Sequence, residues 1–272
     1  MSITNFIATV WSETLISQMN RKYIAVANCN RDFEGEIKNR GDRVKVCGVG
    51  DINIFDYTKN TDFANAAQQL TDNYRLLMIN QAKAFNFQID DVERAQTNPK
   101  IMDAAVKNAA AALANLADQY VFGLCSKAGM SITEDATVDN IIHLLIDART
   151  MLFKNNVCDP GEIIIELSPE IGNLLLKAKI NNTNDDNALE TGCIGTIAGC
   201  KVFVSKNIRV EDGVHKCMVR SKRSIAFAEQ LSEMDAYRPE KRFADAVKGL
   251  HLYGAEVIYP YEMVRLDLTI PA

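Results

Sequence analysis

The stretch FEGEIKNRGDRVKV, residues 33–46, is the part of the sequence from which the fold is best inferred. It is too polar for a core strand and too regular for a plain loop. Val44 and Val46 alternate with Arg43 and Lys45, and GDINIFDY follows closely. Such alternation is typical of a strand whose two faces meet different surroundings. We therefore expect an extended β-ribbon early in the chain, with one face available to a partner.

The second strand of this ribbon is predicted at KAFNFQIDD, residues 83–91, where apolar and polar residues alternate. This segment is the best mate in the sequence for DRVKVCGV, residues 42–49. An isolated two-stranded ribbon is only marginally stable in water, so it needs a further surface to pack on. The candidate contact residues of the ribbon are Arg43, Lys45, Phe85 and Phe87.

Two helices are predicted in the first half of the chain. Residues 3–16 place apolar side chains at helical spacing, and this short amphipathic helix, with Trp11 as a candidate contact, can dock on a neighbour or on its own domain. A much longer helix begins at Asn98-Pro99, a cap followed by a proline at the first helical position, and runs to about residue 127. At 1.5 Å per residue it is about 40 Å long, and Gly129 is its expected C-cap.

The second half of the chain has an α/β pattern. A helix is predicted over residues 138–154, a short buried strand over residues 162–167, and a further helix after Ser168, which has the features of an N-cap. Three segments of strand character follow, and the last of them contains Gly254 at an expected bend or bulge. They are CKVFVSKNI, KCMVRSKRSIAFAEQ and LHLYGAEVIYPYEMVRLDLT.

Composition excludes several classes of protein. The 272 residues are 47% hydrophobic and 24% charged, which is ordinary for a globular chain, and the net charge of -5 argues against a general nucleic-acid binder. No apolar run reaches the roughly 20 residues of a membrane span, and the N-terminus lacks a signal-peptide pattern. The seven cysteines form no CxxC pair, and we expect reduced, buried thiols without a structural role in assembly.

No catalytic, cofactor or metal motif is present in the sequence. CGVGDIN lacks the third glycine of a dinucleotide fingerprint, and GCIGTIAG lacks the Gly-Lys-Ser/Thr of a phosphate loop. His143, His215 and His251 show no ligand spacing, and His143 is expected to be half-buried in a helix. No catalytic residue, cofactor site or metal site is therefore predicted, and several elements lack an obvious internal partner, which is typical of an assembly subunit.

The order of these parts resembles that of tailed-bacteriophage major capsid proteins with the Hong Kong 97 fold. The resemblance rests on four segments taken in sequence, and it covers nearly the whole chain. They are FEGEIKNRGDRVKV as the rising strand of an extended loop, FNFQIDDVERAQTN as its return, GCIGTIAGCKVFVSKNI as strand-turn-strand of an axial domain, and LYGAEVIYPYEMVRL as a closing strand.

The resemblance implies an α+β fold with five parts. These are an N-terminal arm (1–33), the extended β-ribbon loop (34–90), a peripheral domain with its long spine helix (91–135), an α/β axial domain (136–228) and the closing strands of the peripheral domain (229–272). The ribbon then lies over a neighbouring subunit, and the arm reaches across to one. The loop NNTNDDNALE faces the fivefold or sixfold axis, where Asp185 and Asp186 form an acidic ring or point apart as solvated tips.

The implied function is structural and not enzymatic. Pentamers and hexamers of the chain close into an icosahedral shell around double-stranded DNA, which is held without sequence-specific binding. The expected partners are further copies of the chain, a portal protein and a separate scaffolding protein, because the arm begins almost at Met1 and leaves no room for an attached scaffold. The location is the virion, after assembly in the host cytoplasm, with no membrane partner. Two alternatives stay open: an encapsulin-type shell around an enzyme, and an unrecognised α/β enzyme.

Overall fold

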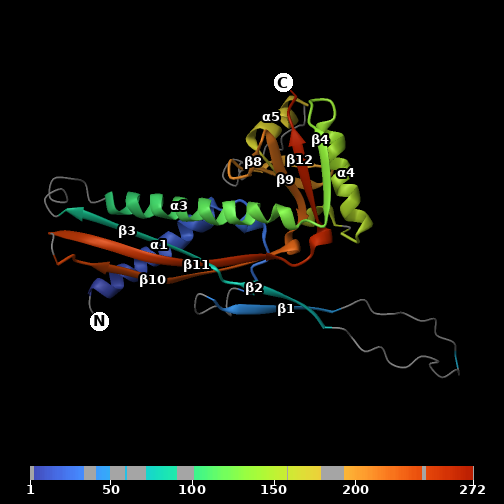
Figure 1. Cartoon of the computed structure of the whole chain (residues 1–272). Helices are drawn as coiled ribbons and strands as arrows, with labels where there is room; N and C mark the ends of the chain where they lie inside the picture. Colours follow the sequence, from blue (N-terminus) through green and yellow to red (C-terminus); the bar gives the residue numbers. More distant parts are fainter. Residues whose placement is uncertain are drawn as a thin grey trace.

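The computed structural model describes residues 3–33, 41–49, 59, 72–90, 101–157, 159–178, 193–240 and 243–271. The chain folds into two bodies (Figure 1). One is elongated and consists of a long antiparallel sheet with a long helix beside it. The other is compact and contains a mixed sheet flanked by two helices. This is the mixed α and β architecture that the sequence predicts.

The elongated body is organised around a three-stranded sheet. Its strands pair in the order β10-β11-β3, and they are β10 (Ile225–Tyr237), β11 (Ala244–Val257) and β3 (Gln81–Asp90). The spine helix α3 (Ile101–Gly123) runs along this sheet (Figure 1). The core between them contains Phe122, Val121, Phe227 and Tyr253, all nearly inaccessible to solvent. A long amphipathic helix on a long sheet buries a continuous apolar stripe, which gives this body its length.

The N-terminal helix is longer than predicted. α1 (Ile3–Lys22) packs on α3 and β10, and its residues Leu15 and Met19 are buried, as is Tyr23 directly after the helix. The segment after it contains the 3-10 turn η1 (Val26–Asn28). This turn redirects the chain so that Asn30 forms a bridge to β10, and the amide of Asn30 donates to the carbonyl of Ile225 at 2.9 Å.

The spine helix confirms the prediction of a long helix, although its proposed start at Asn98-Pro99 lies outside the described residues. Its last turn tightens into η3 (Leu124–Lys127). Gly129 is not the C-cap. Its amide donates to the carbonyl of Pro260 at 2.8 Å, and a Cβ at Gly129 would lie 2.9 Å from that backbone. The glycine is needed because the turn η6 (Pro260–Glu262) approaches this closely.

The predicted pairing of the ribbon is wrong. β1 (Arg43–Val49) pairs antiparallel with β2 (Asp72–Met78), and β3 instead pairs with β11 over its whole length. The range 34–90 thus contains strands of two different sheets. The reason is burial: Phe85 and Phe87 on β3 stack at 5.9 Å and pack against the core below α3, which a free two-stranded ribbon could not offer them.

The base of the ribbon lies on the long sheet. Val44, Val46, Leu77 and Ile79 are buried against a patch of the sheet that includes Leu252. The strand β11 continues through Gly254 without the expected bend. A Cβ on Gly254 would overlap the carbonyl oxygen of Met78, so this glycine permits the ribbon to cross the strand. The bulge in this sheet lies on β10 instead, between residues 231 and 233.

The compact body contains a seven-stranded sheet. Six strands pair in the order β4-β12-β9-β5-β7-β6, and β8 pairs with β9. They are β4 (Met130–Asp135), β12 (Met263–Thr269), β9 (Val214–Ser221), β5 (Ile163–Leu167), β7 (Cys200–Val204), β6 (Cys193–Ile197) and β8 (Val210–Glu211). The helices α4 (Ile141–Lys154) and α5 (Pro169–Lys177) pack against it. The short turn η4 (Pro160–Glu162) leads from α4 into β5, and η5 (Lys222–Ser224) connects β9 with β10.

Most local predictions for the compact body are confirmed. β5 is buried along its length, and Ser168 caps α5 by accepting a hydrogen bond from the Ile171 amide. His143, however, is exposed on α4 and not half-buried. Four cysteines are free and buried: Cys29, Cys125, Cys200 and Cys217. The other three have side chains outside the described part of the chain, so reduction of all seven stays a prediction.

Replacing Gly254 by alanine tests the crossing of the ribbon over β11. We expect Gly254→Ala to lower the free energy of unfolding by about 1–3 kcal/mol, because the added methyl group overlaps a backbone carbonyl that cannot retreat without lifting the ribbon. Urea denaturation measures this. Gly123→Ala is the control, since a methyl group added there would meet nothing within 4 Å and alanine favours the helix. Equal stability of the two variants would contradict the crossing.

Candidate assembly surfaces

The joint between the two bodies is built on Arg220 of β9. Its side chain is fully buried, and its Nε and Nη2 donate to the two carboxylate oxygens of Glu166 on β5, each at 2.9 Å. The remaining donors reach the segment after α1: Nη1 donates to the carbonyl of Asn28 at 2.7 Å and Nη2 to that of Ala25 at 3.1 Å. A bidentate pair with satisfied remaining donors is the form in which a buried guanidinium is tolerated.

The spine helix holds the same segment from the other side. The carboxylate of Asp118 on α3 accepts from the amides of Ile24, at 3.0 Å, and Val26, at 3.1 Å. Asp118 therefore caps the turn η1 from another element, at the amide end where negative charge is favoured. Arg220 binds carbonyls of the same turn, so one short stretch of backbone is attached to α3, β5 and β9 together.

A second cluster fixes the end of α1 to the long sheet. Glu229 of β10 accepts hydrogen bonds from the hydroxyl of Tyr23 and from Arg31 Nη2, the latter at 2.6 Å, and His251 Nε2 lies 2.8 Å away. Burial opposes the charge of Glu229, but His251, Tyr23 and Arg31 together lower its pKa below the ordinary value.

At the joint, burial also opposes the charge of Arg220. Glu166 nevertheless raises the pKa of Arg220, so this guanidinium stays charged. Both clusters therefore fix residues 23–31, at the end of the N-terminal arm, to the rest of the subunit.

The outer face of the ribbon combines positive and apolar side chains. Strand alternation turns Val44 and Val46 toward the long sheet, which leaves Arg43 and Lys45 exposed. The register places Met78 opposite Arg43 and Leu76 opposite Lys45, and Lys45 lies 4.0 Å from the ring centre of Tyr74. The three apolar residues have exposed fractions of 37–51%. We call Arg43, Lys45, Tyr74, Leu76 and Met78 the ribbon face.

The long sheet offers an open surface next to the base of the ribbon. Side chains two positions apart on a strand share a face, so Leu250 lies on the same side of β11 as Leu252, which packs under the ribbon. Farther along this face lies a hollow of about 430 Å³. Its lining combines apolar residues with Asn86 and one exposed ion pair, Lys248 to Asp235 at 3.2 Å. The lining residues are Ala84, Phe85, Asn86, Asp235, Lys248, Gly249 and Leu250.

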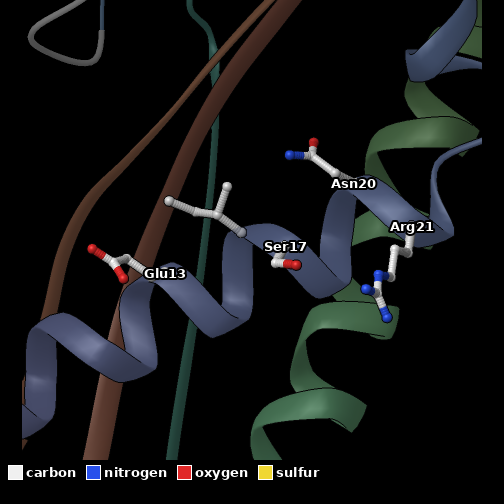
Figure 2. A pocket seen from close by; sticks show the side chains of 5 residues that line it. Glu13, Ser17, Asn20 and Arg21 are labelled. Atoms are coloured by element: carbon white, nitrogen blue, oxygen red, sulfur yellow. The ribbon is translucent and has the colours of Figure 1, made fainter.

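The outward side of α1 is a third surface. Figure 2 shows Glu13, Ser17, Asn20 and Arg21 following one another along the helix. These residues line a hollow of about 530 Å³. Ile16 also lines it and is 42% exposed. Asn20 is tied to the segment after the helix, because its Oδ1 accepts from Arg31 Nη1 at 3.1 Å. Four of the five lining residues are polar or charged.

The predicted contact residues fall in different places. Arg43 and Lys45 are brought together on the ribbon face, whereas Phe85 and Phe87 are half-buried against the core of their own subunit. Trp11 lies within α1, but its side chain is outside the described residues. Asp185 and Asp186 also lie outside them. Contact of any of these residues with a neighbour stays a prediction.

Sequence reasoning missed the residues of the joint. Glu166 stands inside the apolar run of β5, and Arg220 lies in the buried stretch of β9. A single charge in an otherwise apolar strand was the signal available for Glu166, since buried charges require a partner. Arg220 gave no such signal, because β9 also contains His215 and Lys216. Asp118 carried no comparable signal, because an acidic residue every few positions is ordinary on a helix.

The described residues show no arrangement of side chains that is suited to catalysis. Ser168 Oγ lies 2.9 Å from His215 Nδ1, but both are buried and the hydroxyl also caps α5. Within the described ranges, no group of three or more His, Cys, Asp or Glu residues could hold a metal ion. No helix in that part of the chain is long and apolar enough to cross a membrane.

Replacing Glu166 by glutamine tests the joint. We expect Glu166→Gln to lower the free energy of unfolding by about 3–5 kcal/mol, because it leaves the Arg220 guanidinium buried without a countercharge. Glu256→Gln is the matched control: it removes the partner of Lys127 from a half-exposed pair and should cost about 0–1 kcal/mol. Denaturant unfolding measures both, and a loss at Glu166 no larger than at Glu256 would contradict the role of the joint.

Similarity to known proteins is found among solved structures. No protein-family model matches the sequence, and no curated protein matches it. The structure of Mycobacterium phage Che8 is similar with a TM-score of 0.70 and 25% sequence identity, over 90% of this chain and 90% of that chain. The capsid of cyanophage P-SCSP1u is similar with a TM-score of 0.67 and 14% identity, over 86% of this chain and 85% of that chain.

A shell of another kind is also similar. The SrpI encapsulin complex of Synechococcus elongatus PCC 7942 matches with a TM-score of 0.58 and 13% identity, over 85% of this chain and 83% of that chain. Its TM-score lies below those of the two phage structures. Each of these matches covers at least 85% of this chain, and this confirms the predicted fold class. The chain thus has the Hong Kong 97 fold of tailed-bacteriophage major capsid proteins, as its sequence resemblance implies.

Proposed function

We propose that this chain is the major capsid protein of a tailed bacteriophage, and that copies of it form the pentamers and hexamers of an icosahedral shell around double-stranded DNA. The observation that carries the proposal is the ribbon face, which lies away from the subunit that bears it, in a chain similar to a phage structure over 90% of its length. Exposed apolar side chains next to cations are typical of a protein interface.

A second copy of the chain is the partner of the ribbon face. The base of each ribbon already covers one part of the long sheet, and the hollow lined by Ala84 and Leu250 continues the same face. Tyr74, Leu76 and Met78 of a neighbouring ribbon are apolar and of a size to fill such a hollow, while Asp235 on its rim offers a negative charge to Lys45. Each subunit then both gives and receives a ribbon, as a closed ring requires.

The remaining partners follow from the same proposal. DNA fills the shell without sequence-specific contacts, which suits a chain with a net charge of -5. A portal protein and a separate scaffolding protein complete assembly in the host cytoplasm, and the finished protein is located in the virion. The chain acts as a structural protein and not as an enzyme.

An encapsulin-type shell is the second candidate, because an encapsulin shares the fold with a TM-score of 0.58. Cargo distinguishes the two shells. We expect purified particles, examined by electron microscopy and then extracted, to release double-stranded DNA when produced in infected cells. Particles that release a folded enzyme and no DNA would favour the encapsulin. A uniform 30.2 kDa monomer under all conditions, with or without scaffolding protein, would contradict both.

Replacing Leu76 tests the ribbon contact. We expect Leu76→Asp to reduce the yield of shells at least tenfold, because a single buried, unpaired carboxylate costs more than the about 1.4 kcal/mol that corresponds to that factor. The same variant should unfold at the parent's urea concentration, since the side chain is exposed in the free subunit. Leu76→Met, which conserves volume and polarity, is the control and should assemble normally. Normal shell yields from Leu76→Asp would contradict the contact.

A further inference from the structure

The ribbon leaves the subunit at the place where β11 loses one of its two neighbours. The strand β3 pairs with β11 only as far as the partners Gln81 and Tyr253, and β2 precedes β3 in the chain. At Gly254, the next residue of β11, Met78 of β2 crosses the strand. From there to Val257, β11 has β10 on one side, and within the described part of the chain no strand pairs with it on the other. A backbone carbonyl on that open side needs a donor from elsewhere.

The carbonyl of Val257 lies on this open side. The amide of Ile258 donates to the carbonyl of Ser224, directly before β10, at 2.8 Å, so the backbone groups of Ile258 point toward β10. Because neighbouring residues of an antiparallel strand direct their backbone groups to opposite sides, those of Val257 point away from β10. Arg75 of β2 supplies the donor, since its Nη1 donates to the Val257 carbonyl at 3.2 Å. A side chain of the ribbon thus takes the place of a strand.

Arg75 belongs to the inner side of the ribbon. Its partner in the ladder is Val46, and paired residues of neighbouring strands share a face, so both side chains are directed toward the long sheet. Val46 and Leu77 are buried on that side, whereas Arg75 is exposed at the margin of the apolar contact. An arginine can cover an apolar edge with its stem while its planar head binds a carbonyl, so it can extend a contact beyond the apolar core.

We propose that Arg75 is a positioning residue, which fixes the direction in which the ribbon extends from the long sheet. The ribbon meets β11 at two separate points, Met78 at Gly254 and Arg75 at Val257. A single contact would let the ribbon swing about it, whereas two contacts with the same strand define a line. The buried apolar side chains hold the ribbon on the sheet, but their attraction is non-directional. The hydrogen bond to one carbonyl supplies the direction.

The direction of the ribbon decides how the ribbon face is presented. Tyr74 and Leu76 flank Arg75 in the sequence and lie on the opposite side of β2, so they turn with the ribbon. This consequence rests on the proposed function, in which a second copy receives the ribbon face. A direction already fixed in the free subunit reduces the conformational entropy that is lost on binding. The positioning role itself belongs to the single subunit.

Distance measurements on the free, full-length chain test the role of Arg75. Two spin labels are attached through ketone-bearing aromatic residues, one in place of Tyr74 on the ribbon and one in place of Lys107, which is exposed on α3. Pulsed electron paramagnetic resonance then gives the distribution of distances between the ribbon and the spine helix, and sedimentation verifies that the chain is unassembled. We expect one narrow distribution. A broad distribution in the labelled parent would overturn the proposal, whatever the variants show.

Three variants assign the effect to the hydrogen bond. Arg75→Met keeps an unbranched stem and removes every donor, so its distribution should be about twice as broad as the parent's. Arg75→Lys keeps a cationic donor and should restore most of the narrow width. Arg43→Met is the matched control, because it removes the same charge from the outer side of the same ribbon and should leave the width unchanged. Equal widths for Arg75→Met and Arg43→Met would overturn the proposal.

Urea denaturation and shell yield complete the test. Arg75→Met should unfold near the parent's urea concentration, because the side chain is exposed, and broadening that appears only together with unfolding would overturn the proposal. Its shell yield should fall by about threefold or more, since an ordered ribbon face is lost. An unchanged yield would overturn the consequence for assembly. A parent that forms no shells, but whose distances broaden only in Arg75→Met, would contradict the capsid function and still support the positioning role.

Discussion

The buried Arg220–Glu166 pair is the constraint on which the arrangement of the two bodies depends. A guanidinium without solvent must have every donor satisfied, and the donors left over from Glu166 find the carbonyls of Ala25 and Asn28. The chain after α1 must therefore pass through this point. Because Asp118 holds the same turn, the spine helix, the long sheet and the compact body all meet at one stretch of backbone.

This joint explains how the N-terminal helix and the ribbon can extend from a subunit that stays stable. One continuous apolar core runs through both bodies, and the segment after α1 is fixed by hydrogen bonds of defined direction. The ribbon in turn is anchored by its apolar base, which frees its other face. That face combines charged with apolar side chains, as Lys45 does over Tyr74.

The candidate surfaces were only partly predictable. Alternation around Val44 identified the ribbon and assigned Arg43 and Lys45 to its outer face, because strand periodicity depends on neighbours along the chain alone. The mate of that strand was assigned wrongly. Phe85 and Phe87 alternate equally well for a ribbon or a sheet, and the choice between them was made by the core below α3, which no local pattern reveals. The hollow beside Leu250 is likewise a product of tertiary packing.

The sequence by itself determined the elements and their order: the spine helix, the capped helix after Ser168, the buried strand with Glu166 and the early ribbon. These follow from periodicity, capping and turn chemistry, which act over a few residues. Only the tertiary structure decided which strands pair, that position 254 requires a glycine, and which cation forms the ion pair with Glu166. Arg220 lies 54 residues from Glu166 and 192 from Asn28 along the chain. Contacts over such separations depend on the shape of the whole core, which a one-dimensional pattern does not contain.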